Sequence, residues 1–182
     1  MSRVITVTAI GDQGVGKSQL LLNFAQQPFG TYQRFDTYER DLTVYGQTVK
    51  VRANDSCNQS DKSKSSRAAY SGTNTFLLCA AVDKPESLES LVKKWHEDLR
   101  ASNSANLPLI LVLTKCDLQQ NSDVKSLKLD SEEVAQIAQK LRVTDAFECS
   151  AKTGHNVEAA FRRAAELAIR TQMDKKKGCE ML

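Results

Sequence analysis

The sequence predicts an α/β fold, with a six-stranded, mostly parallel sheet, one antiparallel edge strand and helices on both faces. Three observations predict it. Short runs of β-branched and aliphatic residues alternate with stretches of helical spacing along most of the chain. Two strand-like runs flank Gly46, which is typical of a hairpin. A glycine-rich loop joins the first strand directly to the first helix, a connection found in doubly wound sheets.

The first half of the chain holds the strand–loop–helix unit and the hairpin. Residues 4–10 are mostly β-branched, which favours a buried strand, and the helix after the loop ends before Pro28. Two strands, at 38–45 and 48–54, flank the turn glycine and form the antiparallel edge. The segment 55–71 is polar and rich in serine, so we expect a loop with at most a weak helix.

The second half adds strands and helices in alternation, which is the pattern of parallel strands joined by helical crossovers. The strands are short aliphatic runs, and the helices show apolar residues at a spacing of three and four. We expect strands at 75–82, 109–113 and 146–149, and helices at 84–100, 131–141 and 156–172. One domain would then cover residues 1–172, and residues 173–182 would form a flexible tail.

Residues 11–18 fit the phosphate-binding pattern G-x-x-x-x-G-K-[ST] and lie between a strand and a helix, as that pattern requires. Such a loop directs backbone N–H groups and the positive end of a helix at one place, which binds a polyphosphate. Lys17 would reach the β- and γ-phosphates, and the Ser18 hydroxyl would coordinate Mg²⁺. The predicted contacts of the nucleotide here are Asp12, Gln13, Gly14, Val15, Gly16, Lys17, Ser18 and Gln19.

Two later motifs favour guanine over adenine, and both follow predicted strands. The Asp117 carboxylate, in the motif 114–117, can accept hydrogen bonds from N1–H and the exocyclic amine of guanine, which adenine cannot offer together. A site built on that acceptor rejects the wrong base, because the carboxylate would be left unpaired. The Lys115 stem would cover the base plane, and the motif 150–152 would bring a backbone N–H to the guanine oxygen. The predicted base or ribose contacts are Phe29, Thr114, Lys115, Asp117, Leu118, Ser150, Ala151 and Lys152.

With these motifs the chain resembles a small GTPase of the Ras superfamily over essentially its whole length. Within it the chain is most similar to the Rho family. The threonine form of the base motif at 114–117 resembles that of the Rac-like branch, and the pair Lys94-Trp95 and the stretch 148–152 are also Rho-like. The resemblance implies GTP and GDP binding, Mg²⁺, GTP hydrolysis and signal transduction. It also implies effectors and regulators that bind two switch regions, 30–38 and 55–71, and a connection with the actin cytoskeleton.

The resemblance also assigns roles in metal binding and catalysis. Residues 55–59 stand where the family has Asp-x-x-Gly-Gln. Asp55 would hold Mg²⁺ through water, together with Ser18, and Gln59 would position the attacking water while Lys17 stabilises the phosphates.

Three departures from the family fall on the γ-phosphate side. Gln13 replaces a glycine, and its side chain would project toward the water and any arginine finger, whose contribution alone is about 10³–10⁵ in rate. Asn58 replaces a glycine whose N–H meets the γ-phosphate. The first switch is shorter than in the family, so that the position of the threonine on Mg²⁺ falls near Gln33. Thr31 and Thr37 flank that position, and either could substitute, although neither aligns with it. We therefore expect slow GTP hydrolysis and little response to a Rho-type activating protein; the alternative is drift in solvated loops with the chemistry intact.

Two other functions fit parts of the same pattern. A non-catalytic, constitutively GTP-loaded interaction module would need the same motifs, and the ratio of GTP to GDP in the isolated protein would distinguish it from a switch. A phosphate-loop kinase would need a lid and an acceptor site, and no segment of the sequence suggests either.

The last four residues, 179–182, fit the prenylation pattern C-a-a-X, and a terminal leucine favours geranylgeranyl on Cys179. Glu180 departs from the aliphatic preference at its position. The three residues Lys175, Lys176 and Lys177 would add about 1 kcal/mol each of attraction to an anionic leaflet. We expect a cytoplasmic protein attached peripherally to the cytoplasmic face of a membrane.

Composition narrows the remaining possibilities. The net charge of +3, without a basic face or stacking aromatics, argues against nucleic acid as a partner. No run approaches the roughly 20 apolar residues that span a bilayer. The five cysteines have neither metal-type nor paired spacing, so we expect reduced thiols in a reducing compartment.

Overall fold

The computed structural model describes residues 3–31, 37–56, 70–102, 104–120 and 131–180. Six strands form a single sheet in the order β2-β3-β1-β4-β5-β6. All neighbouring pairs are parallel except β2 and β3, which are antiparallel at the edge. The strands are β1 (Arg3–Ile10), β2 (Thr37–Val44), β3 (Gln47–Asp55), β4 (Thr75–Ala81), β5 (Leu109–Thr114) and β6 (Asp145–Glu148). The predicted sheet is confirmed.

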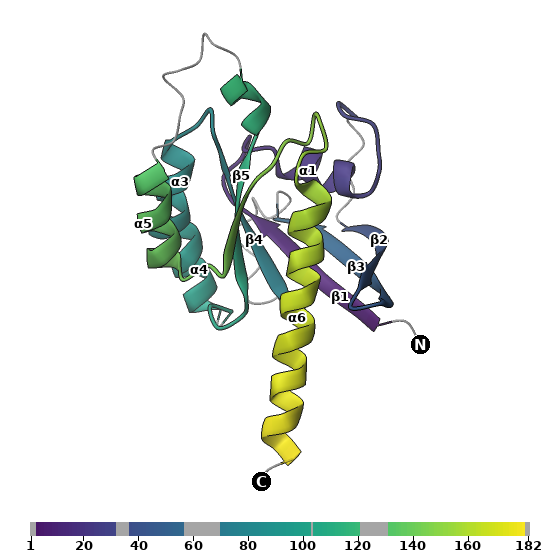
Figure 1. Ribbon diagram of the computed structural model, residues 1–182. Coiled ribbons are helices and arrows are strands. Elements are labelled where there is room, and N and C mark those ends of the chain that lie inside the picture. Colours follow the sequence, from purple (N-terminus) through teal and green to yellow (C-terminus); the bar gives the residue numbers. More distant parts are fainter. Residues whose placement is uncertain (1–2, 32–36, 57–69, 103, 121–130, 181–182) are drawn as a thin grey trace.

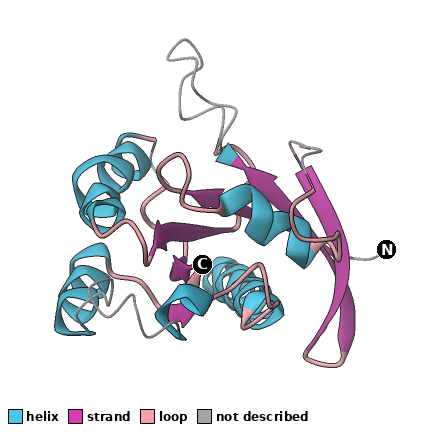
Figure 2. Ribbon diagram, turned by 90° about the horizontal axis from the view of Figure 1, so that it is seen from above, coloured by secondary structure: helices cyan, strands magenta, loops and turns pink. Residues whose placement is uncertain are grey.

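Helices cover both faces of this sheet (Figures 1 and 2). The elements are α1 (Lys17–Phe24), α3 (Glu86–Ser90), the π-helical turn η2 (Leu91–Trp95), α4 (His96–Ala101), the 3₁₀ turn η3 (Cys116–Gln120), α5 (Ser131–Leu141) and α6 (Val157–Glu180). The helix predicted over 84–100 corresponds to a continuous helical run over 86–101, whose middle turn, η2, is π-helical. Such a turn adds a residue within a helix and shifts the side chains after it.

The side chains of the central strand β1 alternate between the two faces of the sheet, which explains why the molecule has two hydrophobic cores. In β1, Ile5, Val7 and Ala9 pack with α1 and α6, whereas Ile10 packs with α3, α4 and α5. Successive side chains of a strand point to opposite faces, so a fully buried strand needs apolar residues on both. The sheet is therefore the rigid middle layer of the molecule.

The hairpin closes through a two-residue turn. Tyr45 and Gly46 both have positive φ, at 51° and 73°. A turn of this kind, with two left-handed residues, matches the right-handed twist of the strands it joins. The predicted turn at Gly46 is confirmed, and each flanking strand ends one residue away from its predicted boundary.

The C-terminal helix runs beyond its predicted end at Gln172, and that predicted boundary is wrong. α6 continues to Glu180 and extends past the rest of the molecule (Figure 1). The residues after Gln172 include Met173 and a run of lysines, which are good helix formers, and no proline interrupts them. The division into a domain over 1–172 and a flexible tail over 173–182 stays a prediction. Within the described residues, no helix is long and apolar enough to span a bilayer.

The carboxyl ends of the parallel strands β1, β4, β5 and β6 lie at the same edge of the sheet. The loops that leave them hold residues 11–16, 82–85, 115–117 and 149–156. Ligands of open α/β sheets bind at this edge.

Candidate functional site

The phosphate loop leaves β1 at Gly11 and enters α1 at Gly16. A Cβ atom on Gly11 would lie 2.2 Å from the Cys79 carbonyl oxygen, so only glycine fits where the loop crosses β4. Gly16 has a φ of 91° and precedes α1 with no side-chain cap, so the first N–H groups of the helix remain available to a ligand. The sequence motif at 11–18 is therefore explained by backbone geometry.

Lys17 fixes the shape of this loop from inside. Its ammonium donates to the carbonyl oxygens of Gly11 at 2.7 Å and Asp12 at 2.8 Å, and the residue is 2% exposed. A buried ammonium bonded to two carbonyls draws the loop around itself and adds positive charge at its centre. The arrangement suits an anion with several oxygen atoms.

Ser18 and Asp55 lie together beside the loop. The Ser18 hydroxyl donates to the Asp55 carboxylate at 2.6 Å, and joins the start of α1 to the end of β3. A hydroxyl and a carboxylate are the hard oxygen ligands that Mg²⁺ takes when phosphates supply the rest of its coordination. These residues therefore fit a magnesium ion, and its binding here stays a prediction.

A cavity of about 290 Å³ lies next to the loop. All the predicted base contacts except Ser150 line it, and they come from the ends of β5 and β6 and from the segment after α1. Its walls are formed by Gly16, Gln19, Leu20, Phe29, Thr114, Lys115, Asp117, Leu118, Ala151 and Lys152. Separate stretches of sequence thus converge on one pocket of the size of a small ligand.

Asp117 is oriented by Ser150, which does not itself line the cavity. The Ser150 hydroxyl, which is buried, donates to Oδ1 of Asp117 at 2.6 Å. That bond occupies one carboxylate oxygen and leaves acceptor capacity on the other. A carboxylate fixed in this way can read two adjacent N–H donors on the edge of a planar base.

Lys115 is oriented by an acidic residue that the sequence motifs do not include. Its ammonium donates to Oδ2 of Asp83 at 2.8 Å, and its backbone has a φ of 62°. The pair extends the lysine stem along the cavity wall, where it can cover a flat ring. A strained backbone at a binding residue persists because its neighbours fix it.

Three further hydrogen bonds join the base motifs to the phosphate loop, to β4 and to α1. The Thr114 hydroxyl donates to the carbonyl oxygens of Val15 and, at 3.1 Å, Ala80. The Asn23 amide donates to the Ala151 carbonyl at 3.0 Å. Loop, base motif and α1 therefore form one connected unit.

The sequence model of the Ras family matches residues 6–170. The chain belongs to the Ras family. More specifically, it is a divergent small GTPase of the Rho type. The GTP-binding protein RHO1 of Candida albicans is 31% identical over 188 residues, which cover 95% of this chain and 93% of the relative. GTP-binding protein rho3 of Schizosaccharomyces pombe is 31% identical over 172 residues (91% and 83%), and human Rho-related GTP-binding protein RhoB is 30% identical over 183 residues (95% and 93%).

The start of the first switch of this Rho-type protein is tied to α1. Gln19 accepts a hydrogen bond from the Gly30 N–H at 3.0 Å and donates to the Thr31 carbonyl at 3.2 Å. Phe29 is 56% exposed at the mouth of the cavity, where a ring could cover one side of a ligand. The sequence predicts that Phe29 contacts the base or the ribose, and the residue lies in the wall of this cavity.

The two candidate metal threonines are bonded elsewhere. The Thr31 hydroxyl donates to the Pro28 carbonyl at 2.7 Å, and the Thr37 hydroxyl donates to Oδ1 of Asn54 at 3.0 Å. Neither is bonded to the pair Ser18 and Asp55. Gln59 and Asn58 lie outside the described residues, as does Gln33, at the aligned position of the metal threonine.

Trp95, at a Rho-like position, reaches the phosphate loop. Its indole N–H donates to Oδ1 of Asp12 at 2.9 Å, and the Lys94 ammonium lies 3.8 Å from the same oxygen. These bonds turn the Asp12 carboxylate toward the helix that holds Trp95. Gln13, the next residue, is exposed.

The thiols beside the base motifs are packing groups. Burial, with smaller contributions from Asp117 and Glu148, raises the pKa of the Cys116 thiol. Burial also raises the pKa of Cys149 well above the usual range of a thiol. Both groups are therefore neutral at physiological pH, and neither is a nucleophile.

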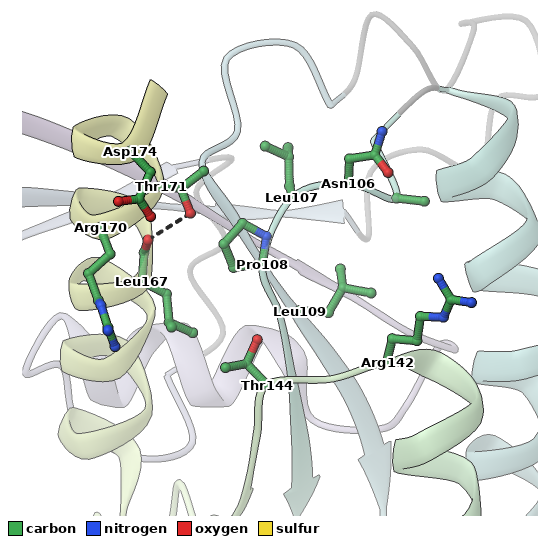
Figure 3. Close-up of a pocket in the computed structure, with 11 residues that line it drawn as sticks. Asn106, Leu107, Pro108, Leu109, Arg142, Thr144, Leu167, Arg170, Thr171 and Asp174 are labelled. Carbon is green, nitrogen blue, oxygen red and sulfur yellow. Dashed lines mark hydrogen bonds between the residues drawn. The ribbon is translucent and has the colours of Figure 1, made fainter. Parts of the chain in front are cut away.

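A second cavity, of about 400 Å³, lies at the amino ends of β5 and β6, away from the predicted site. Figure 3 shows Arg170 and Asp174 of α6 on one side and Arg142 on the other, with Pro108 between them. Both arginines are exposed, and none of the predicted contacts lies there. Cys179 lies in the last turn of α6, and the structure does not describe the position of its side chain.

Proposed function

We propose that this protein binds GTP and GDP in the cavity beside the phosphate loop and works as a molecular switch. The observation that carries the proposal is the Asp117 carboxylate, which Ser150 orients into the same cavity that the phosphate loop borders. A guanine ring offers the two N–H donors that this carboxylate can accept, whereas adenine offers no such pair. The relatives named above as GTP-binding proteins support the same ligand.

We propose that Mg²⁺ accompanies the nucleotide. Ser18 would coordinate it directly, and Asp55 would hold it through water. The metal neutralises charge between the β- and γ-phosphates when bound. Ser18 and Asp55 would then exchange their mutual hydrogen bond for contacts with the ion and its water.

We also propose that GTP hydrolysis is slow. Gln13 is exposed beside the phosphate loop, and its amide has no hydrogen-bond partner among the described residues. The side chain is free to occupy the space that the attacking water and an arginine finger need. The finger contributes about 10³–10⁵ in rate, so steric exclusion there removes most of the possible acceleration.

Single-turnover hydrolysis of bound GTP tests this proposal. We expect a rate below about 3 × 10⁻⁴ s⁻¹, the lower end of the intrinsic rate of Ras, and less than about tenfold acceleration by a Rho-type activating protein. Binding of guanine nucleotide together with acceleration of 10³-fold or more would refute slow hydrolysis and leave the binding proposal intact.

The remaining proposals concern location and partners. Effectors and regulators would bind the switch regions 30–38 and 55–71, and the actin cytoskeleton is the expected target of the signal by analogy with the Rho family. A geranylgeranyl group on Cys179, aided by Lys175–Lys177, would attach the protein to the cytoplasmic face of a membrane. Cys179→Ser should move the protein from the membrane fraction to the soluble fraction; unchanged association would exclude the lipid.

A further inference from the structure

Lys84 lies in the loop between β4 and α3, and its backbone position is fixed by buried hydrogen bonds. Its N–H donates to the Ala81 carbonyl at 3.0 Å. The Ser87 hydroxyl, in a residue that is 1% exposed, donates to the Lys84 carbonyl at 2.5 Å and accepts from the Ala81 N–H at 3.0 Å. These hydrogen bonds therefore fix the place where the Lys84 side chain leaves the backbone.

The Lys84 side chain extends to the phosphate loop. A Cβ atom built on Gly14 would lie 2.9 Å from Nζ of Lys84, so the ammonium lies directly against this glycine. Gly14 has a φ of 81° and is exposed, and it belongs to the part of the loop whose N–H groups face a bound polyphosphate.

The ammonium is unpaired within the part of the chain that the structure describes. Among the described residues, Lys84 makes neither an ion pair nor a side-chain hydrogen bond. Two carboxylates, of the preceding residue and of the phosphate loop, are engaged elsewhere: Asp83 pairs with Lys115 at 2.8 Å, and Asp12 accepts from Trp95 and lies near Lys94. An unpaired cation placed at an anion-binding loop is available to the anion.

We propose that Lys84 is a second phosphate-binding lysine, which donates to a phosphate oxygen of the bound nucleotide alongside Lys17. The two lysines act from different sides. Lys17 is buried under the loop and bonded to its carbonyls, whereas the Lys84 ammonium lies against its outer surface at Gly14. This inference rests on the proposed nucleotide binding and adds a residue to it.

The proposal has a specific electrostatic signature. A lysine that contacts phosphate slows nucleotide release, and its contribution weakens as salt screens the charges. Lys84 would contribute this without touching the base. Its effect should therefore depend on the phosphates and on ionic strength, which a change in folding would not.

The test compares release rates of fluorescently labelled GDP from the full-length wild type, Lys84→Gln, Lys84→Arg and the control Lys93→Gln. Lys93 is a matched lysine on the following π-helical turn, where it is exposed and pairs with Glu89. We expect Lys84→Gln to release GDP about 10-fold faster at low salt, the effect of losing a hydrogen bond to a charged group, and Lys84→Arg to retain most of the slow release. Lys93→Gln should match the wild type.

The salt dependence of GDP release decides between this role and a structural one. In 1 M salt the difference between Lys84→Gln and the wild type should shrink to less than about twofold, because the Debye length is then about 3 Å. A Lys84→Gln variant that releases GDP at the wild-type rate, or one whose defect does not change with salt, overturns the proposal. Failure of the wild type to bind GDP would instead refute the proposed function.

Discussion

The base half of the site and its γ-phosphate half differ in how their side chains are supported. In the base half, Asp117 is bonded to Ser150 and Lys115 to Asp83, and both predicted binding residues follow the end of β5. In the other half, Gln13 is exposed and has no hydrogen-bond partner among the described residues. Under the proposed function, recognition of the base would depend on these pre-organised side chains, whereas hydrolysis would depend on groups outside them.

This difference indicates that nucleotide affinity and the rate of GTP hydrolysis can change independently within one fold. Pre-organised groups cost little to order when a ligand binds, so affinity survives changes elsewhere. Hydrolysis needs a positioned water and stabilised charge on the γ-phosphate, and a single bulky side chain there can block both. Four changes, taken from the largest expected effect to the smallest, can break or sharpen this contrast.

Asp117→Ala should have the largest effect. It removes the acceptor of the two guanine N–H groups, and we expect GDP affinity to fall by at least about 10³-fold, measured by calorimetry. Ser150→Ala, which removes only the supporting hydroxyl, should cost about 10-fold. If Asp117→Ala bound GDP within threefold of the wild type, the base half would not be the recognition element.

Gln13→Gly should raise the rate of GTP hydrolysis by about tenfold, equivalent to about 1.4 kcal/mol of transition-state stabilisation, because it reopens space at the γ-phosphate. GDP affinity should stay unchanged, since the base half is untouched. Single-turnover release of phosphate gives the rate. An unchanged rate would locate the obstacle in the switch regions, in the stretches 30–38 and 55–71.

Asp83→Asn tests whether the ion pair between Lys115 and Asp83 contributes to nucleotide affinity. Loss of the carboxylate weakens the bond that extends Lys115 along the cavity wall, and we expect GDP affinity to fall about 3- to 10-fold. Oδ1 of Asp83 is buried and has no hydrogen-bond partner among the described residues, so the neutral amide should not lower the melting temperature. Unchanged affinity in a calorimetric titration would show that Lys115 needs no partner.

The cysteines should show the smallest effect. Because burial raises the pKa of Cys116 and Cys149, the thiolate fraction is reduced at neutral pH and rises only as the pH approaches the raised values. We expect little alkylation of either by a maleimide at pH 7 in the folded protein, measured by peptide mass spectrometry, and full alkylation after unfolding. Rapid modification of Cys116 in the native state would contradict the packing role.

Much of this site could be predicted because its motifs are local. The phosphate loop, the base motif and the strands that precede them are each contiguous in sequence, and their periodicity or spacing reflects backbone geometry. The convergence of Phe29, Asp117 and Lys152 on one cavity follows from the parallel sheet that this pattern predicts.

The supporting contacts could not be predicted, because they join residues far apart in sequence. Trp95 and Asp12 are separated by 83 positions, and Lys115 and Asp83 by 32. No pattern within either segment indicates such pairs; they depend on how the helix run containing Trp95 and the loop after β4 lie at the sheet edge. The end of α6 was misjudged for a different reason: its lysine run resembles a solvated tail, yet lysine also favours helix.

Calorimetric titration of the purified protein with GDP and with ADP, in Mg²⁺, tests the central claim most directly. The account predicts one site that binds GDP at least about 10³-fold more tightly than ADP, because only guanine satisfies the Asp117 carboxylate. Equal affinity for the two nucleotides, or no binding of GDP at millimolar concentration, would contradict it.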